Sequence, residues 1–175
     1  MKILLTHGYF LDEDPKEREI MRPYVPLGIL CISAYLEQHG YDNQVFDSTF
    51  SSFEKLKEYL FTRKPDVIGI YTNLMTKLNV LRIIKLIRSD ESLHHSKIIL
   101  GGPEVRNHIE NFLEHGADVL VLGEGEQTML ELVQVFGKKS QTELEEIPGI
   151  AFLNSKKEIV KTISRPNIRD LEELP

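Results

Sequence analysis

Short apolar runs alternate along the chain with longer segments of helical periodicity. Five runs of aliphatic and β-branched residues lie at 3–5, 45–46, 67–71, 98–100 and 119–122. Continuous apolar runs of this length are typical of strands that are buried on both faces of a parallel sheet. Between the runs, apolar residues recur every three or four positions, which predicts amphipathic helices that cover the two faces.

The expected helices also carry start and stop residues. Their apolar stripes span 27–35, 53–60, 80–87, 105–113 and 129–136. Ser51 or Ser52 can cap the second of these helices, since a serine side chain accepts a hydrogen bond from a free backbone N–H. Gly40, Gly116 and Gly137 follow three of the stripes and favour helix ends there.

The last part of the chain departs from this rhythm. Residues 148–152 and 158–161 predict a short hairpin, and residues 164–175 are polar and bounded by proline, as in a linker. We therefore predict an α/β fold of the flavodoxin-like (Rossmann-like) class, a doubly wound five-stranded parallel sheet with a C-terminal β-hairpin and linker. We expect residues 1–140 to form the α/β domain and residues 141–175 to form the hairpin and linker.

Composition narrows the possible partners. The 175 residues carry a formal net charge of -6, which argues against binding to nucleic acid. The single cysteine, Cys31, excludes an internal disulfide and an iron–sulfur cluster held by this chain, and it favours a cytoplasmic location. No apolar run approaches the roughly 20 residues of a membrane helix, so no membrane contact is expected.

Small and polar residues follow the strands at the edge where open parallel sheets bind their ligands. Two adjacent glycines after the fourth strand would leave bare backbone against which a ligand could lie. Each of these segments also has a purely structural alternative, such as a surface loop, a helix cap or a tight turn. The residues that we expect to bind a cofactor are Pro26, Leu27, Gly28, Thr72, Asn73, Leu74, Met75, Gly101, Gly102, Pro103, Gly123, Glu124, Gly125 and Glu126.

The sequence gives no sign of catalytic residues or of a protein-only metal site. His7 ends the first strand, but no second histidine, cysteine or carboxylate lies at metal-ligand spacing from it. No nucleophile elbow is present, no G-x-G-x-x-G follows the first strand, and there is no phosphate-binding P-loop. A bound cofactor would therefore carry any chemistry.

Several motifs occur in an order that resembles one enzyme family. They are V-P-L-G-I-L at 25–30 with A-Y-L-E at 34–37 and H-G-Y at 39–41, G-G-P-E at 101–104, E-H-G-A-D at 114–118, G-E-G-E at 123–126, I-P-G-I-A at 147–151, and R-P, D-L and L-P at 165–166, 170–171 and 174–175. The set resembles the N-terminal cobalamin-binding domain of the cobalamin-dependent radical S-adenosylmethionine enzymes, over nearly the whole chain.

The resemblance implies cobalamin in the crevice above the sheet. Its dimethylbenzimidazole tail would lie beside residues 101–102, residues 123–126 would close the tail side, and the corrin would rest over the first loop and residues 72–75. The resemblance further implies a downstream domain that holds the iron–sulfur cluster and S-adenosylmethionine. The intact protein would be a methyltransferase or cyclase, while this chain, which lacks the C-x-x-x-C-x-x-C motif, would only bind.

One departure concerns cobalt. Cobalamin mutases and methionine synthase carry D-x-H-x-x-G after the first strand, and its histidine ligates cobalt. Here Leu5 lies two positions before His7 and Phe10 lies three after it, so the motif fails. We expect base-off cobalamin without a histidine lower ligand.

Two alternatives stay open. The fold could bind another ligand such as flavin or act as a signalling receiver, or it could be a ligand-free scaffold. Tyr71 and Thr72 stand where a receiver would carry its phosphorylatable aspartate, and the first loop is not a flavodoxin phosphate loop. Retention of hydroxocobalamin would separate these functions, and we expect Gly102→Leu to abolish retention while leaving the fold intact.

Overall fold

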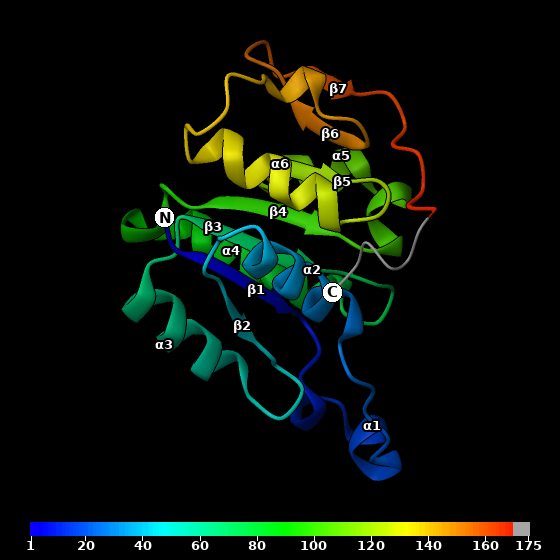
Figure 1. Ribbon diagram of the computed structural model, residues 1–175. Helices are drawn as coiled ribbons and strands as arrows, with labels where there is room; N and C mark the ends of the chain where they lie inside the picture. Colours follow the sequence, from blue (N-terminus) through cyan, green and yellow to red (C-terminus); the bar gives the residue numbers. More distant parts are fainter. Residues whose placement is uncertain (170–175) are drawn as a thin grey trace.

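A seven-stranded sheet runs through the protein in the order β2-β1-β3-β4-β5-β6-β7, and Figure 1 shows helices packed on both of its faces. The computed structural model describes residues 1–169. Five strands pair in parallel: β1 (Ile3–His7), β2 (Gln44–Phe46), β3 (Val67–Tyr71), β4 (Lys97–Gly101) and β5 (Val119–Val121). The predicted fold class is confirmed.

The predicted hairpin extends this sheet. It consists of β6 (Ile150–Leu153) and β7 (Ile159–Lys161), which pair antiparallel to each other. β6 also pairs antiparallel with β5, so the hairpin forms one end of the sheet. The proposed division of the chain after residue 140 stays a prediction.

Alternate residues of the strands supply two apolar cores. Leu4 contributes to the core beneath α3 (Phe53–Arg63), α4 (Lys77–Ser89) and α5 (Ile109–Glu114). Ile3 and Leu5 contribute to the core beneath α2 (Leu27–Gln38) and α6 (Glu126–Phe136). Each strand therefore buries both faces, which explains why the apolar runs are continuous rather than alternating.

One predicted helix is divided in the structure. The stripe at 105–113 forms a 3₁₀ helix, η3 (Pro103–Asn107), followed by the short α5. His108 lies between them with φ −139° and ψ 42°, which is outside the helical region and ends the first segment. The apolar positions were read correctly, but the continuous helix was wrong.

The loop after β1 contains two elements that we did not predict. They are η1 (Leu11–Glu13) and α1 (Pro15–Ile20), and Figure 1 shows α1 projecting away from the sheet. Asp14 caps α1 by accepting hydrogen bonds from the backbone N–H groups of Lys16 and Glu17. Because α1 buries no residue, it has no apolar stripe, and only the Asp14–Pro15 start signal could have revealed it.

The remaining 3₁₀ turns among the described residues are η2 (Glu91–Leu93) and η4 (Leu144–Glu146).

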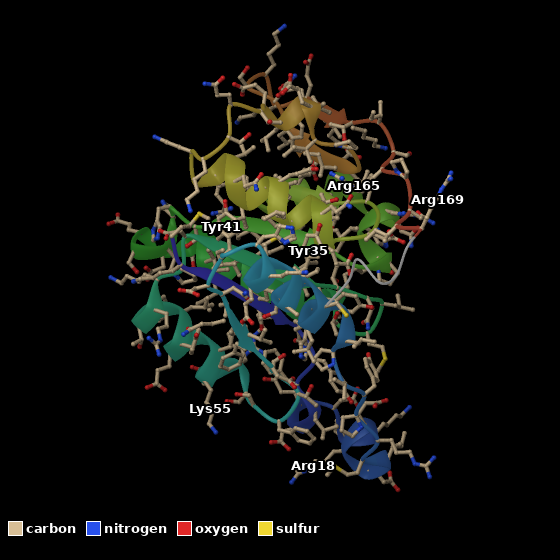
Figure 2. The ribbon with its side chains drawn as sticks, viewed as in Figure 1. Arg18, Tyr35, Tyr41, Lys55, Arg165 and Arg169 are labelled. Atoms are coloured by element: carbon tan, nitrogen blue, oxygen red, sulfur yellow. The ribbon has the colours of Figure 1, made fainter. Side chains whose placement is uncertain are left out.

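The segment after β7 is fastened to α6 and to the loop before it. The Arg165 guanidinium donates to Gln127 Oε1 at 3.2 Å and pairs with Glu131, and Figure 2 shows it beside α6. The backbone N–H of Ile168 donates to Glu124 Oε2 at 2.6 Å. The predicted linker is thus an ordered strap up to residue 169, while its D-L and L-P motifs at 170–171 and 174–175 lie outside the described residues.

We predict that Arg165→Met lowers the free energy of unfolding by about 1–3 kcal/mol, because it removes charge-assisted hydrogen bonds from a side chain that is only 9% exposed. Urea unfolding measures the change. Lys55→Met on α3 is the matched control, since Lys55 is exposed and we expect a change within about 0.5 kcal/mol. Equal losses in the two variants would contradict the assignment.

Candidate functional site

Two adjoining cavities lie at the carboxyl edge of the parallel strands. The glycine cavity has a volume of about 200 Å³ and contains six glycines in its wall. The tyrosine cavity has a volume of about 280 Å³ and includes three tyrosines. Both are lined by Gly28, Ile29 and Tyr71, so they are neighbouring parts of one crevice.

The glycine cavity lies beneath α2 and α6 and has mostly apolar walls. Leu5, Ile99 and Val121 form its floor, and Ile32 and Met129 approach from the helices. Two carboxylates, Glu124 and Glu126, are also part of its lining. The arrangement suits a largely apolar ring, and the two carboxylates disfavour a phosphate group only in their immediate vicinity.

At three glycines of this cavity, the neighbouring atoms leave enough room for a larger residue. A Cβ at Gly28 would meet nothing within 4 Å, and at Gly101 or Gly123 it would meet one atom at 4.0 Å. Side chains at these positions would project into open space that a ligand can otherwise occupy. The absence of Cβ atoms therefore creates room in the crevice.

Gly102 differs from these three glycines because the fold itself requires it. Its φ is +105°, and a Cβ would lie 2.3 Å from the carbonyl oxygen of Thr72 and 3.0 Å from the ring of Tyr71. The expectation that Gly102→Leu leaves the fold intact was therefore wrong. The sequence shows that a glycine stands at position 102, but it does not show that the carbonyl oxygen of Thr72 lies against it in the folded chain.

The structure brings ten of the fourteen predicted cofactor residues to the crevice. Pro26, Leu27, Gly28 and Asn73 line the tyrosine cavity. Gly28, Gly101, Gly102, Gly123, Glu124, Gly125 and Glu126 line the glycine cavity. Contact of these residues with a cofactor stays a prediction.

The other four predicted residues line neither cavity. Thr72 is buried below the loop after β3, whereas Leu74, Met75 and Pro103 are exposed. Asn73 and Thr76 exchange hydrogen bonds across this loop, each accepting from the backbone N–H of the other at 3.0 Å. The segment therefore forms a tight turn, which is one of the structural alternatives to ligand binding considered above. The turn directs Leu74 and Met75 outward.

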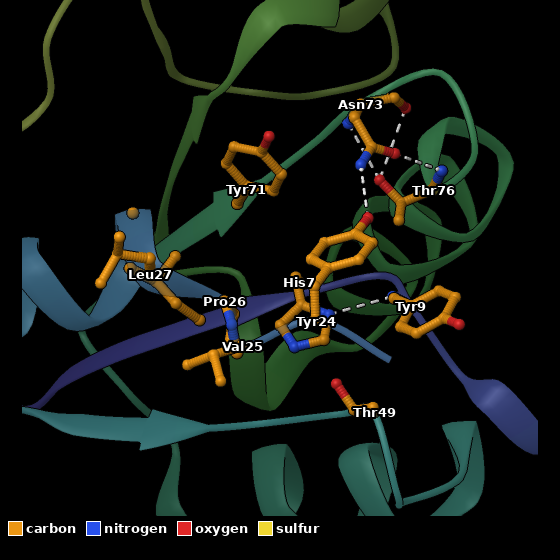
Figure 3. A pocket seen from close by; sticks show the side chains of 12 residues that line it. His7, Tyr9, Tyr24, Val25, Pro26, Leu27, Thr49, Tyr71, Asn73 and Thr76 are labelled. Carbon is orange, nitrogen blue, oxygen red and sulfur yellow. Dashed lines mark hydrogen bonds between the residues drawn. The ribbon is translucent and has the colours of Figure 1, made fainter. Parts of the chain in front are cut away.

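Sequence reasoning missed much of the tyrosine cavity. Its remaining lining residues are His7, Tyr9, Tyr24, Val25, Ile29, Thr49, Tyr71 and Thr76. His7 ends the first strand and Thr49 lies shortly after the second, so the topology of the sheet could have indicated both. Figure 3 shows how the residues converge from four separate segments.

Both ring nitrogens of His7 are engaged by protein groups. Nδ1 accepts a hydrogen bond from the backbone N–H of Tyr9 at 3.2 Å, so Nε2 carries the proton and donates to Asp47 Oδ1 at 2.9 Å. Burial lowers the pKa of His7, although the neighbouring Asp47 acts in the opposite direction. His7 is therefore a neutral imidazole without a free nitrogen for a metal.

Two tyrosines fasten the first loop over the cavity. The rings of Tyr9 and Tyr24 stack with their centroids 5.9 Å apart. Tyr9 donates its hydroxyl to Glu17 at 3.0 Å, and Tyr24 accepts from the Asn73 amide at 3.2 Å. Burial, together with the Glu17 carboxylate, raises the pKa of Tyr9 to about 12, so its hydroxyl stays protonated near neutral pH.

Within residues 1–169, no three histidine, cysteine or carboxylate side chains gather where they could hold a metal ion. Over the same range, no helix is both long and apolar enough to cross a bilayer. The crevice, rather than a cluster of ligating side chains, is thus the feature that invites a functional interpretation.

We predict that stability falls as His7 is forced to take up a proton. Because its pKa is lowered by folding from the ordinary 6.5, the unfolded chain binds the proton more readily. The contribution is present above about pH 6.5 and is lost as the pH falls toward the folded-state pKa, with a slope of at most about 1.4 kcal/mol per pH unit. Urea midpoints measured from about pH 7 to about pH 5 should therefore fall less steeply for His7→Gln than for the parent protein. Parallel slopes would contradict this role.

We also predict opposite effects of alanine at two glycines of the crevice. Gly102→Ala should lower the free energy of unfolding by about 2 kcal/mol or more, because it combines a positive φ with a backbone clash. Gly28→Ala should leave it unchanged or raise it by about 0.5 kcal/mol, because Gly28 is a helical residue with open space around it. Chemical unfolding of the pair tests both, and equal values would refute the distinction.

Comparison with known families and relatives gives a consistent result. The family described as "B12 binding domain" matches residues 19–133, which is more than half of the chain. The chain is 28% identical over 162 residues to the anaerobic magnesium-protoporphyrin IX monomethyl ester cyclase of Cereibacter sphaeroides, covering 89% of this chain and 26% of the relative. It is 27% identical over 183 residues to the corresponding cyclase of Rubrivivax gelatinosus, covering 99% of this chain and 32% of the relative.

Among solved structures, the fold is similar to that of the cobalamin-dependent S-adenosylmethionine radical enzyme OxsB with aqua-cobalamin bound. The TM-score is 0.84 at 22% identity, over 99% of this chain and 23% of that chain. The chain thus spans about a quarter to a third of the length of these relatives. The matches confirm the family resemblance that the ordered motifs predicted.

Proposed function

Because the chain belongs to the B12-binding domain family, we propose that it binds cobalamin in the crevice at the carboxyl edge of its sheet. The observation that supports this most directly is the open space at Gly28, Gly101 and Gly123, where no neighbour forbids a side chain. The dimethylbenzimidazole tail would enter the glycine cavity, and the corrin would lie over the adjoining tyrosine cavity.

The dimensions of the crevice suit a ligand that extends across both cavities. Binding sites for small molecules typically have volumes of about 300–1,000 Å³. The cavities measure about 200 and 280 Å³, so each alone is small, but they share Gly28, Ile29 and Tyr71. A cofactor with a separate tail and ring system can use both.

We further propose that the bound cofactor is base-off and receives no histidine from this domain. His7 is the histidine nearest to the site of the D-x-H-x-x-G motif, and both of its nitrogens are already hydrogen-bonded. Ligating cobalt would require breaking its bond to Asp47 or to the backbone of Tyr9. The domain would instead hold the cofactor by apolar packing against the walls of the crevice.

In the intact protein, cobalamin would supply cobalt-centred methyl transfer or a related radical reaction, of methyltransferase or cyclase type. A downstream radical S-adenosylmethionine domain would hold the iron–sulfur cluster and S-adenosylmethionine, because the one cysteine of this chain cannot. The strap at residues 162–169 runs from β7 to the crevice, where the backbone N–H of Ile168 donates to Glu124 in the cavity wall. The role of this chain is to bind and orient.

The experiment is retention of hydroxocobalamin. We expect the purified protein to keep the corrinoid through desalting, with the visible spectrum of cobalt that lacks a lower imidazole. Loss of all corrinoid on desalting, together with no detectable binding at equilibrium, would contradict the proposal. A spectrum of nitrogen-ligated cobalt would contradict the lower-ligand assignment alone.

Gly101→Leu tests the tail position. Its Cβ would meet only Val121 at 4.0 Å, so the larger side chain fills the glycine cavity without a backbone clash. We expect the Kd for cobalamin to rise at least about tenfold, while the Kd for cobinamide, which lacks the tail, changes by less than about twofold. Gln38→Leu, at the exposed far end of α2, is the control and should bind both as the parent does. Equal losses for the two corrinoids would place the tail elsewhere.

A further inference from the structure

Thr49 carries a buried hydroxyl on the wall of the tyrosine cavity that no protein group satisfies. The residue is 2% exposed, and its Oγ1 has no hydrogen-bond partner among the described residues. Figure 3 shows Thr49 on the wall of the cavity opposite Tyr24, with its hydroxyl on the side of His7. A buried hydroxyl without a partner lowers the stability of a protein, so its presence calls for a function.

Both backbone polar groups of Thr49 are hydrogen-bonded, whereas its side-chain hydroxyl is not. The backbone N–H donates to Asp47 Oδ1 at 2.9 Å, and the carbonyl accepts from the backbone N–H of Leu11 at 3.1 Å. Asp47 Oδ1 also accepts from His7 Nε2. Burial acts to raise the pKa of Asp47, but the nearby hydroxyl and backbone N–H of Thr49 help to lower it. Asp47 Oδ1 already accepts from two donors and no hydrogen bond of ordinary geometry joins it to the Thr49 hydroxyl, so the hydroxyl can turn to a ligand.

The surroundings of Thr49 define the chemistry that this ligand should have. His7, Asn73 and Thr76 are hydrogen-bonded within the protein, and Tyr9 donates to Glu17. The half-buried Tyr71 hydroxyl has no partner among the described residues, but unlike Thr49 it is partly open to water. The remaining wall is largely aromatic and aliphatic. An anion would be repelled by Asp47, whereas a neutral group with one good acceptor would match the buried Thr49 hydroxyl.

Primary amides are neutral groups of this kind, and they rim the corrin ring of cobalamin. If the tail fills the glycine cavity, the rim of the ring would lie over the tyrosine cavity, because the two cavities adjoin at Gly28, Ile29 and Tyr71. We propose that the tyrosine cavity receives one amide side chain of the corrin, whose carbonyl accepts a hydrogen bond from Thr49 Oγ1. This inference rests on the proposed function and adds to it a specific subsite and a specificity-determining residue.

If this subsite exists, Thr49→Val should preserve or raise the thermal stability of the corrinoid-free protein and weaken its binding of the corrinoid. Valine has nearly the shape of threonine but lacks the unpaired hydroxyl, so the corrinoid-free variant should unfold at the same or a higher temperature. The same change should raise the Kd for hydroxocobalamin about tenfold, because the amide carbonyl is left without its donor. Thr49→Ser keeps the hydroxyl and should bind within about twofold of the parent.

Cobinamide separates this subsite from the tail site. It keeps the amide rim, so Thr49→Val should weaken its binding as much as that of cobalamin, whereas Gly101→Leu should affect cobalamin alone. If the parent protein binds neither corrinoid, the proposed function itself fails. If it binds both and Thr49→Val binds them equally well, or if Thr49→Val lowers thermal stability with unchanged Kd, only the subsite is overturned and the hydroxyl is structural.

Discussion

The crevice depends on a close backbone approach between the loops that follow β3 and β4. Gly102 adopts a positive φ, and its Cα lies so near the carbonyl oxygen of Thr72 that no side chain fits between them. Next to this contact, the backbone N–H of Thr72 donates to the carbonyl of Gly101 at 2.8 Å and extends the pairing of the two strands by one bond. The two loops are held together beneath the crevice, and the neighbouring glycines face open space above them.

The two cavities differ in what they can offer a ligand: one offers open volume and the other an unpaired hydrogen-bond donor. The glycine cavity offers volume, because missing side chains at several strand ends are not replaced by other atoms. The tyrosine cavity offers a hydrogen-bond donor, because the fully buried hydroxyl of Thr49 has no partner among the described residues, whereas His7, Asn73 and Thr76 are bonded within the protein. His7, a residue that could ligate a metal, is bonded to Asp47 and Tyr9 instead. Binding in such a crevice would rest on shape and on a few hydrogen bonds rather than on coordination.

The fold could be predicted from the sequence because each parallel strand is buried on both faces and therefore forms a continuous apolar run. The hairpin and the helix ends at Gly40 and Gly116 followed from equally local signals. The site was predicted less completely, since contacts such as that of Gly102 with Thr72 join residues far apart in the sequence. The tyrosine cavity is the clearest example, because Tyr9, Tyr24 and Thr49 form no motif, and only the topology brings them together. Leu74 and Met75 were misplaced because a local turn between Asn73 and Thr76 decides their direction.

The sheet is bounded by β2 and β7, and each of these edge strands has only three residues. Lys161 closes β7, and Gln44 opens β2 with an exposed polar side chain. So short a ladder of unpaired backbone groups offers little template for a further strand, from another copy or from a neighbouring domain. Growth of the sheet is therefore disfavoured at both ends, and association through side chains and loops is the route that this architecture leaves open.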